Sequence, residues 1–323
     1  MIAAVDIGNS KTDVLLLDKQ GDVVSWSSTG AIALTYTSPR DTARALRSLL
    51  PSGAQISRMW IGAAGADFPD QEEEFAAEVR LLDSFGEVTV RNDIFALLGC
   101  VRIEGSGIAV VAGAGMNAVG VTGDQVVRFA ALGELSGDLG GGGYLGARAV
   151  SMACRGADGR GSATALTGAL LEYFDVATAD ELSRGLSNGR LPASHLLKLG
   201  PIVFDRARDG DEVALSLVRE QAIEVQAFIR ATASRMDREA SSLPIALGGS
   251  ILRFGQDLLE PAIRGGFPEE VLDLHFIDFP PVVGAAVEGL RLEGVTVEPA
   301  AIASQLSRLR SRKIPVESCL SST

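Results

Sequence analysis

The feature that most constrains the fold is an apolar strand, a turn and a second apolar strand at the start of the chain. The apolar run 2–5 leads into Asp6-Ile7-Gly8-Asn9-Ser10-Lys11, and residues 12–18 resume the apolar character. A short polar turn then leads to residues 23–29, which alternate like a half-buried strand. Three strands joined by tight turns, with no helix between them, predict an antiparallel meander. This order excludes a Rossmann domain, which places a helix directly after its first strand.

The same pattern restarts after residue 107. Apolar residues 108–112 precede a glycine turn, residues 118–122 form a second strand, and a hairpin turn leads to a third strand at 126–131. Most of the chain beyond this point has helical periodicity. The repeated pattern predicts an internal structural duplication, and 323 residues are long enough for two domains.

Strands alternate with helices between the two meanders. Ser38-Pro39 is a typical helix start, with Ser38 as the N-cap. Further on, the pattern predicts a strand at 59–63, a helix at 70–82, a strand at 88–91 and a helix from Asp93. Strands separated by helices are typical of parallel pairing, so we expect this part of the first sheet to be parallel.

Composition excludes several classes of protein. The formal net charge is −12, whereas a nucleic-acid-binding protein normally carries a basic stripe, and the basic run 308–313 is typical of a solvated helix face. The three cysteines lack metal-binding spacing, and the N-terminus lacks a basic segment followed by an apolar one. No apolar stretch approaches 18 residues. We therefore expect a cytoplasmic protein with neither a nucleic acid nor a membrane as partner.

The first candidate site is the turn that begins at Asp6. A carboxylate at the end of a strand, followed by a turn with converging N–H groups, suits Mg²⁺ and a polyphosphate. The alternative is an ordinary hairpin turn shaped by its Asp and Asn side chains. Lys11 is either a phosphate contact or a solvent-facing lysine of that turn.

Two further candidates are glycine turns that follow apolar strands, Gly113–Asn117 and Gly248–Ser250. Glycines without side chains allow backbone N–H groups to approach a phosphate closely, although either segment also suits a structural turn. The first lacks the spacing of the dinucleotide fingerprint, and the chain has no Walker A lysine.

The last candidates are the run Gly140–Gly143, with Asp138 before it, and Asp93. Four consecutive glycines at a helix start favour a ligand loop over a flexible linker, because the helix N-terminus attracts anions. Asp93 follows a strand and precedes a helix, so it is either an N-cap or a carboxylate that faces a cleft.

Taken in this order, the motifs resemble those of the actin-like superfamily of sugar kinases, chaperones and actin, and most closely the N-acetylglucosamine kinase / BadF-BadG-BcrA-BcrD ATPase family. The resemblance implies an α/β fold of two actin-like (ribonuclease H-like) domains with a nucleotide cleft between them. The matching stretches cover most of the chain: VDIGNSKTDVLLLD (5–18), WIGAAGAD (60–67), RNDIFALLG (91–99), GIAVVAGAGMNAVG (107–120), GDLGGGGYLG (137–146) and ALGGS (246–250).

The resemblance implies a role for each motif in an ATP- and Mg²⁺-dependent kinase. Asp93 matches the catalytic base beside the substrate, and Asp6 matches the acid associated with Mg²⁺. Asp138 matches an acid that contacts the sugar, and Gly65 and Gly140 lie in loops expected to line the sugar site. The residues expected to bind ATP are Gly8, Asn9, Ser10, Lys11, Thr12, Gly113, Ala114, Gly115, Met116, Asn117, Gly248, Gly249 and Ser250.

The resemblance also predicts the organisation of the chain. We expect an N-terminal actin-like domain at 1–104, with the tail 295–323 packed on it, and a C-terminal actin-like domain with helical insertions at 105–294. The substrate is expected to be a small sugar, most simply an amino sugar such as glucosamine or N-acetylglucosamine, and the protein is expected to form a homodimer.

Three departures from the family pattern concern the acceptor. The family's Gly-Asp-Glu-Gly is Gly137-Asp138-Leu139-Gly140 here, and a segment with Trp becomes 130–133, which has Leu132. The Thr-Asn pair that usually holds sugar hydroxyls is replaced by Leu34-Thr35-Tyr36. These changes leave phosphoryl transfer untouched and leave the identity of the sugar open.

Rival functions exist in the same superfamily. Activators of 2-hydroxyacyl-CoA dehydratases hold an iron–sulfur cluster with cysteines, but here no cysteine follows Asp93 until Cys100. A sugar sensor that lost catalysis would be indicated by loss of Asp93, which is present. Asp-Ile-Gly-Asn-Ser is also similar to bacterial pantothenate kinases, although the later motifs match amino-sugar kinases better.

Overall fold

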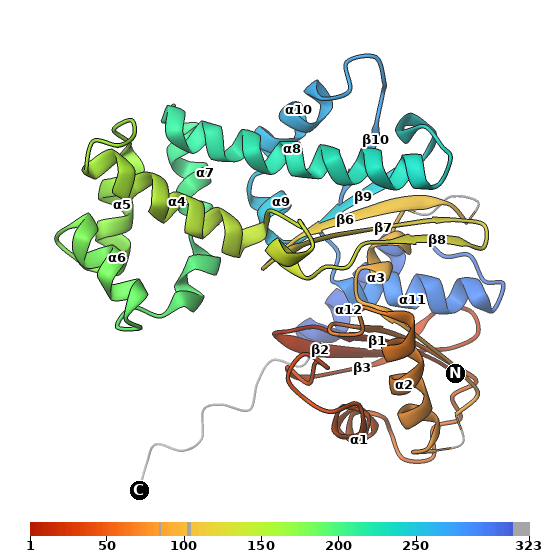
Figure 1. Ribbon diagram of the computed structural model, residues 1–323. Helices are drawn as coiled ribbons and strands as arrows, with labels where there is room; N and C mark the ends of the chain where they lie inside the picture. The colour runs from red at the N-terminus through yellow and green to blue at the C-terminus, as the bar shows by residue number, and fades with distance from the viewer. Residues whose placement is uncertain (84, 102–104, 313–323) are drawn as a thin grey trace, which may run out of the picture. The chain divides into compact units, whose positions relative to one another are not determined.

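The computed structural model describes residues 1–83, 85–101 and 105–312 and divides the chain into two compact units (Figure 1). Unit 1 comprises Met1–Cys100 and the segment from Phe279 onward, and unit 2 comprises Val101–Asp278. The chain therefore returns from unit 2 to unit 1 after residue 278, whereas the sequence analysis predicted this boundary after residue 294. Residues 102–104 and 313–323 of the expected domain and tail lie outside the described residues.

Unit 1 contains a five-stranded mixed sheet in the order β3-β2-β1-β4-β5. The first three strands pair antiparallel, and β1, β4 and β5 pair parallel. This confirms the predicted meander and the predicted parallel part. The strands are β1 (Ile2–Ile7), β2 (Lys11–Leu17), β3 (Val23–Gly30), β4 (Arg58–Ala63) and β5 (Glu87–Asn92).

Helices cover both faces of β1, which explains its continuous apolar run. Ala3, Val5 and Ile7 share a core with Leu46 of α1 and Phe75 of α2. Ser38 caps α1 as expected, since its hydroxyl accepts the N–H of Asp41 at 3.2 Å. The helices of unit 1 are α1 (Pro39–Leu49), α2 (Pro69–Arg80), α3 (Phe95–Leu98), α11 (Pro281–Leu292) and α12 (Pro299–Arg312).

Helix α11 accounts for the position of the second boundary. Its Gly289 faces Ile2 of β1 and Trp60 of β4, and its Gly284 meets the backbone of α3. Eight residues of α11 between Val282 and Leu290 are buried, so this helix is an integral part of the first core. Its periodicity predicts a buried helix, but periodicity alone does not say which sheet the helix covers.

Unit 2 repeats the topology of unit 1. Its sheet has the order β10-β9-β6-β7-β8, with β6, β7 and β8 antiparallel and β6, β9 and β10 parallel. The predicted internal duplication is therefore confirmed at the level of strand order. The strands are β6 (Gly107–Ala112), β7 (Met116–Thr122), β8 (Gln125–Arg128), β9 (Pro244–Gly248) and β10 (Asp273–Phe276).

The helices of unit 2 form one large apolar core with its sheet. The long helix α8 runs along β6 and β7, and α4–α7 gather beyond one end of the sheet (Figure 1). The helices are α4 (Gly141–Ala157), α5 (Ala165–Phe174), α6 (Ala179–Ser187), α7 (Gly200–Arg208), α8 (Glu212–Arg235), α9 (Ser250–Phe254) and α10 (Gln256–Gly265), with 3₁₀ turns η1 (Gly133–Leu135), η2 (Ala193–Lys198) and η3 (Ala240–Ser242). Within the described ranges, no helix has both the length and the apolar character to cross a membrane.

The contact between α3 and α11 leads to a stability prediction. A Cβ atom at Gly284 would lie 1.7 Å from the carbonyl oxygen of Ala96, so Gly284→Ala forces the two helices apart. We expect Gly284→Ala to lower the free energy of unfolding by about 1–3 kcal/mol, the usual range for overpacking. Gly168, in the interior of α5, is the matched control because nothing lies within 4 Å of its Cβ position. Gly168→Ala should stabilise by about 0.5–1 kcal/mol. Urea unfolding of both variants checks this, and equal effects would contradict it.

Candidate active site

Two predicted carboxylates of unit 1 lie at the same edge of its sheet. Asp6 is in β1, level with Gly62 of β4, and Asp93 directly follows β5. Because the carboxyl ends of parallel strands share an edge, the register brings Asp6 and Asp93 to one end of the sheet. Asp93 does not cap α3 through its side chain, because the N-cap position belongs to Ile94.

Asp6 is buried among other acids. Only 4% of its surface is exposed. Burial raises the pKa of Asp6 to about 8, the charges of Asp93 and Asp13 add to the shift, and Lys11 partly offsets it. A buried carboxyl group surrounded by negative charge is what a divalent cation would stabilise in its ionised form.

The residues present fit Mg²⁺ in one particular way. Within the described residues, no group of three or more Asp, Glu, His or Cys side chains could hold a metal by themselves. Mg²⁺ typically keeps several waters and uses one or two carboxylates together with substrate phosphates. Asp6 suits this arrangement.

The second carboxylate, Asp93, is partly exposed, and its pKa lies above the usual value for an aspartate. Desolvation raises the pKa of Asp93 to about 6, the charge of Asp67 adds to it, and backbone N–H groups of Ile94 and of Asp93 itself oppose it. Asp67 is a site residue that the sequence analysis did not select. Its carboxylate accepts the amide of Asn92 at 2.8 Å, and desolvation raises its pKa as well. The sequence did contain an indication of Asp67, because this residue is the last one of the matching stretch 60–67.

The loop that presents Asp93 is held by a buried glutamate. Glu72 of α2 accepts the backbone N–H of Asn92 at 2.9 Å and pairs with Arg91 at 3.0 Å. The Asn92 side chain in turn accepts the N–H of Ile94 at 3.1 Å. Side-chain bonds on both sides of Asp93 therefore fix the turn between β5 and α3.

The turn between β1 and β2 is closed by one hydrogen bond, from the N–H of Gly8 to the carbonyl of Lys11 at 2.9 Å. Asn9 and Ser10 are exposed at its tip. Thr12 is fully buried, and its hydroxyl has no hydrogen-bond partner in the described part of the chain. The turn thus exposes Asn9, Ser10 and Lys11, whereas the Thr12 side chain faces the interior.

Lys11 makes an ion pair that the sequence did not predict. Its ammonium lies 2.6 Å from the carboxylate of Asp13, a residue with a fully buried side chain in the middle of β2. Burial alone would raise the pKa of Asp13, but hydrogen bonds from Lys11, Trp26 and Ser28 outweigh it and lower the pKa. Asp13 is therefore ionised, and it holds the side chain of Lys11 against the turn.

Gly65 lies where two loops of unit 1 meet. A Cβ atom there would lie 2.5 Å from the N–H nitrogen of Thr35, and its φ of 85° favours glycine. The structure thus brings Gly65 to Leu34-Thr35-Tyr36, the segment that replaces the family's Thr-Asn pair. Thr35 and Tyr36 are exposed beside it.

In unit 2, three glycine segments converge at the ends of β6 and β9. The N–H groups of Gly142 and Gly143 donate to the carbonyls of Gly113 and Ala114 at 2.7 and 2.9 Å. From the other side, a Cβ atom at Gly249 would lie 2.3 Å from the carbonyl oxygen of Ala112. The predicted segments Gly113–Asn117, Gly140–Gly143 and Gly248–Ser250 therefore form one cluster.

The outer side of this cluster is open. No atom lies within 4 Å of a Cβ position at Gly113 or Gly115, and Ala114, Gly115 and Ser250 are exposed. A phosphate or another small anion can therefore approach this backbone directly. The side chain of Met116 is buried, and its sulfur accepts the side-chain amide of Gln221 at 3.2 Å, so only its backbone is left for the predicted contact. The Asn117 side chain accepts the N–H of Ala118 at 2.7 Å.

The run Gly140–Gly143, predicted as a ligand loop, makes backbone contacts within unit 2. Its N–H groups at positions 141, 142 and 143 are all bound within the protein, the first by the side chain of Gln221 at 2.9 Å. A Cβ atom at Gly141 would lie 2.4 Å from the carbonyl of Gly115. These glycines allow the start of α4 to pack against the turn 113–115.

Asp138 is buried just before this run. It retains 6% exposure, and its carboxylate accepts the hydroxyl of Ser136, which also accepts the N–H of Leu132 at 2.9 Å. Leu132, in the segment that departs from the family pattern, is 52% exposed, and Leu135, just after that segment, is 93% exposed. The loop thus presents apolar side chains beside a partly satisfied carboxylate.

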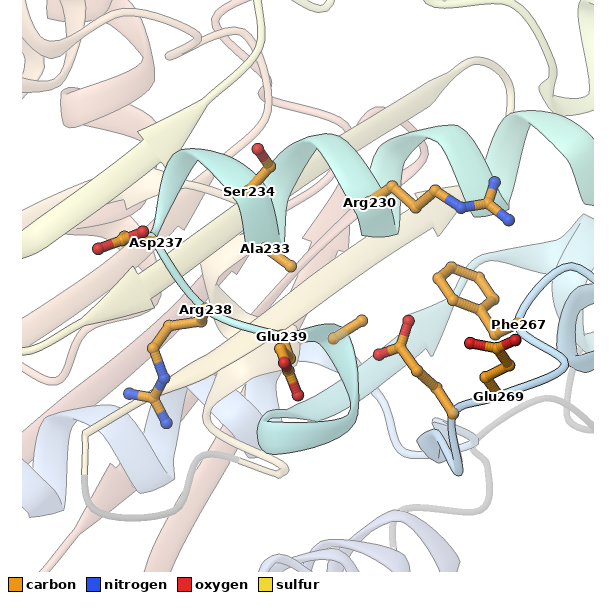
Figure 2. A pocket seen from close by; sticks show the side chains of 10 residues that line it. Arg230, Ala233, Ser234, Asp237, Arg238, Glu239, Phe267 and Glu269 are labelled. Atoms are coloured by element: carbon orange, nitrogen blue, oxygen red, sulfur yellow. The ribbon is translucent and has the colours of Figure 1, made fainter.

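A pocket of about 780 Å³ in unit 2 contains none of the predicted site residues. It lies between the end of α8 and the segment after α10, where the guanidinium of Arg230 lies 4.4 Å from the ring centre of Phe267 (Figure 2). Arg238, Glu239 and Glu269 line it as well. Both signs of charge line this pocket, which is separate from the glycine cluster.

Comparison with known proteins supports the same fold. The chain is 23% identical over 261 residues to an N-acetylmuramic acid/N-acetylglucosamine kinase of Clostridium acetobutylicum, covering 78% of this chain and 85% of that protein. It is 21% identical over 271 residues to a glucosamine kinase of Vibrio cholerae, covering 80% and 88%.

Comparison with solved structures also supports this fold. A candidate N-acetylglucosamine kinase of Chromobacterium violaceum superposes with a TM-score of 0.69 at 25% identity, covering 90% of this chain and 98% of that one. A glucokinase of the ROK family from Streptomyces griseus, solved with glucose and AMPPNP, gives 0.55 at 19% identity, covering 90% and 98%.

The two five-stranded mixed sheets match the two-domain actin-like sugar-kinase fold of these structures. The model of one family matches residues 4–289, nearly the whole described chain. The chain therefore belongs to the BadF/BadG/BcrA/BcrD ATPase family.

Proposed function

We propose that this protein transfers the terminal phosphoryl group of ATP to a hydroxyl group of an amino sugar, such as glucosamine or N-acetylglucosamine. The observation that carries the proposal is the pair Asp6 and Asp93 at one edge of the unit 1 sheet. One carboxyl group is buried among acids, as a magnesium ligand would be, and the other has its pKa raised to about 6, as a general base would.

In this proposal, backbone groups bind the nucleotide. Ala114, Gly115 and the segment Gly248–Ser250 bind it through backbone N–H groups, while the N–H of Gly113 donates to the carbonyl of Gly115 at 3.0 Å and shapes the turn. Gly8–Lys11 contribute contacts to the phosphates. Fixed backbone donors need no reorganisation during the reaction, which is why they stabilise developing charge well. The open space at Gly113 and Gly115 supports this assignment.

Asp6 would hold Mg²⁺, which neutralises negative charge on the phosphates when it is bound. Asp6 remains protonated at neutral pH without a cation, because its pKa is raised to about 8. Its position in β1, with 4% exposure, keeps its oxygens in one place.

Asp93 would orient the acceptor hydroxyl and accept its proton. Phosphoryl transfer depends mainly on positioning and charge neutralisation, so a strong base is not needed. A carboxylate with a pKa of about 6 is ionised at neutral pH and still accepts a proton more readily than an ordinary Asp. The bonds of Glu72 and Asn92 around it keep it oriented.

The amino sugar is supported by the relatives, two of which are kinases of glucosamine or N-acetylglucosamine. Asp138 would receive hydrogen bonds from the sugar through the oxygen that Ser136 does not occupy. The exposed Leu132 and Thr35 stand where the family has other residues, so the sugar's substituents can differ from those of the relatives' substrates.

The rival activator function would require a cysteine thiolate near Asp93. Burial raises the pKa of Cys100 to about 12, and Glu288 adds to the shift. A thiol in this environment stays protonated and is a poor ligand for an iron–sulfur cluster. Cys100 therefore favours the kinase over the activator.

The first prediction concerns the acceptor. In a coupled assay of ADP release, glucosamine or N-acetylglucosamine should give a higher kcat/KM than glucose or pantothenate. Asp138→Ala should raise the KM of the preferred sugar and leave the KM of ATP within about twofold, because the lost bonds are charge-assisted contacts to the sugar. Preference for glucose or pantothenate would remove the amino-sugar assignment and keep the kinase.

The second prediction concerns Asp93. Asp93→Asn keeps the size of the side chain but removes the proton acceptor, so kcat should fall by about 10²–10⁴. ATP affinity should stay within a few-fold, as measured by calorimetry. Asp70→Asn, at an exposed position in the first turn of α2, is the matched control and should leave kcat unchanged. Normal turnover of Asp93→Asn would assign Asp93 a purely structural role.

The third prediction concerns pH. The raised pKa of Asp93 means that its carboxyl group is protonated and inactive below about pH 6 and ionised above it. The kcat/KM for the sugar should therefore rise with pH through about 6, whereas an ordinary Asp would place this rise near 4. Asp67→Asn removes a neighbouring negative charge and should move the rise to lower pH. A profile that does not respond to Asp67→Asn would contradict the assignment of the rise to Asp93.

A further inference from the structure

A cluster of charges beneath the β1–β2 turn joins the two ends of unit 1. The Asp13 side chain is 1% exposed, and one of its oxygens, Oδ2, receives both the ammonium of Lys11 at 2.6 Å and the guanidinium of Arg310 at 3.1 Å. Its other oxygen, Oδ1, accepts the indole N–H of Trp26 at 3.0 Å. Two cations thus share one buried carboxylate.

Helix α12 brings Arg310 to this place. Ile302 and Leu306 of α12 are buried with 0% and 1% exposure. Gln305 between them accepts the N–H of Val23 at 2.8 Å and donates to the side chain of Asp22 at 3.3 Å. The helix is therefore fixed on the β2–β3 hairpin.

The two cations are not held equally. Arg310 lies over the ring of Trp26 at 5.0 Å, and its side chain is 31% exposed, with its Nε atom enclosed. The Lys11 side chain is 47% exposed, and its residue ends the turn that the proposed function assigns to phosphate. Lys11 can rotate away from Asp13 into solvent, whereas Arg310 is confined by Trp26 and α12.

We propose that Arg310 is a positioning residue that keeps Asp13 neutralised so that Lys11 is free to bind the phosphates of ATP. This role rests on the proposed function. The cluster carries two positive charges and one negative charge, so one positive charge is in excess and available to an anion. When Lys11 moves to a phosphate, Arg310 remains paired with Asp13.

Without Arg310 the same movement is costly. Among the described residues, Lys11 would then be the only side-chain cation within bonding distance of Asp13. Its departure would leave a buried carboxylate without a charge partner among them, a strongly unfavourable state. Asp13 would therefore retain Lys11 and withhold it from the nucleotide. Helix α12 thereby controls whether Lys11 in the β1–β2 turn is available to the phosphates.

The test compares ATP with adenosine, which lacks phosphates. Arg310→Gln should weaken ATP binding by about 10- to 100-fold, the effect of withholding one charge partner. Adenosine affinity should change less than twofold. Arg308→Gln is the matched control, because Arg308 is exposed two residues away on the same helix and should leave both affinities unchanged. An equal loss for ATP and adenosine would indicate a merely structural role and overturn the proposal.

Two further variants separate positioning from folding. In the Arg310→Gln background, Asp13→Asn removes the charge that retains Lys11 and should restore ATP affinity to within about threefold of wild type, although it removes another polar contact. Arg310→Lys keeps the charge and should also bind ATP nearly normally, which provides a measurement should Arg310→Gln fold poorly. Failure of both to restore binding would overturn the role of Arg310. Absence of Mg²⁺-dependent ATP binding in wild-type protein would instead overturn the proposed function itself.

Discussion

The backbone contact at the ends of β6 and β9 is the constraint on which the proposed nucleotide-binding cluster of unit 2 depends. The carbonyl of Gly113 accepts the N–H of Gly142, and Gly249 leaves room for the carbonyl of Ala112 where a Cβ atom would lie 2.3 Å away. The turn 113–115 is therefore held from two sides by the main chain. Its remaining side is open because Gly113 and Gly115 lack side chains, so the backbone of this turn is accessible on that side.

Sequence reasoning predicted the fold well because its signals are local. The apolar runs and tight turns define the two meanders, and the alternation of strands with helices predicts the parallel part. The boundary at 294 was misplaced because α11 is a buried helix in either unit, and only its contacts with Ile2 and Trp60 show which sheet it covers. Periodicity reports that a face is buried and not what buries it.

The site was predicted less completely, because the sequence does not show which distant residues contact each other. The positions of Asp6 and Asp93 follow from strand ends, which are local features. The glycines at 140–143 were interpreted as a ligand loop, because their hydrogen bonds to the turn at 113 are invisible in sequence. Asp13 was missed because a polar residue in an apolar strand gives no hint of its partners, one of which, Arg310, lies 297 positions away.

The two units share one topology but differ in a cross-strand residue pair close to the first turn of each sheet. In unit 1 the second cross-strand pair from that turn is Asp6 with Asp13, and in unit 2 the equivalent pair is Val111 with Asn117. Like charges directly opposite each other destabilise a sheet, so the arrangement in unit 1 weakens the strand pair by itself. It persists because Lys11, Trp26 and Arg310 compensate Asp13, while the raised pKa of Asp6 keeps that carboxyl group protonated.

Unit 2 needs no such compensation, because neither residue of its equivalent pair, Val111 and Asn117, is charged. A locally unfavourable feature that is retained in one copy of a duplicated fold, and surrounded by dedicated partners, points to a functional requirement at that copy. The duplicated meander has thus diverged in its chemistry. Unit 1 concentrates carboxylates and the cations that control them, and unit 2 offers uncharged backbone donors.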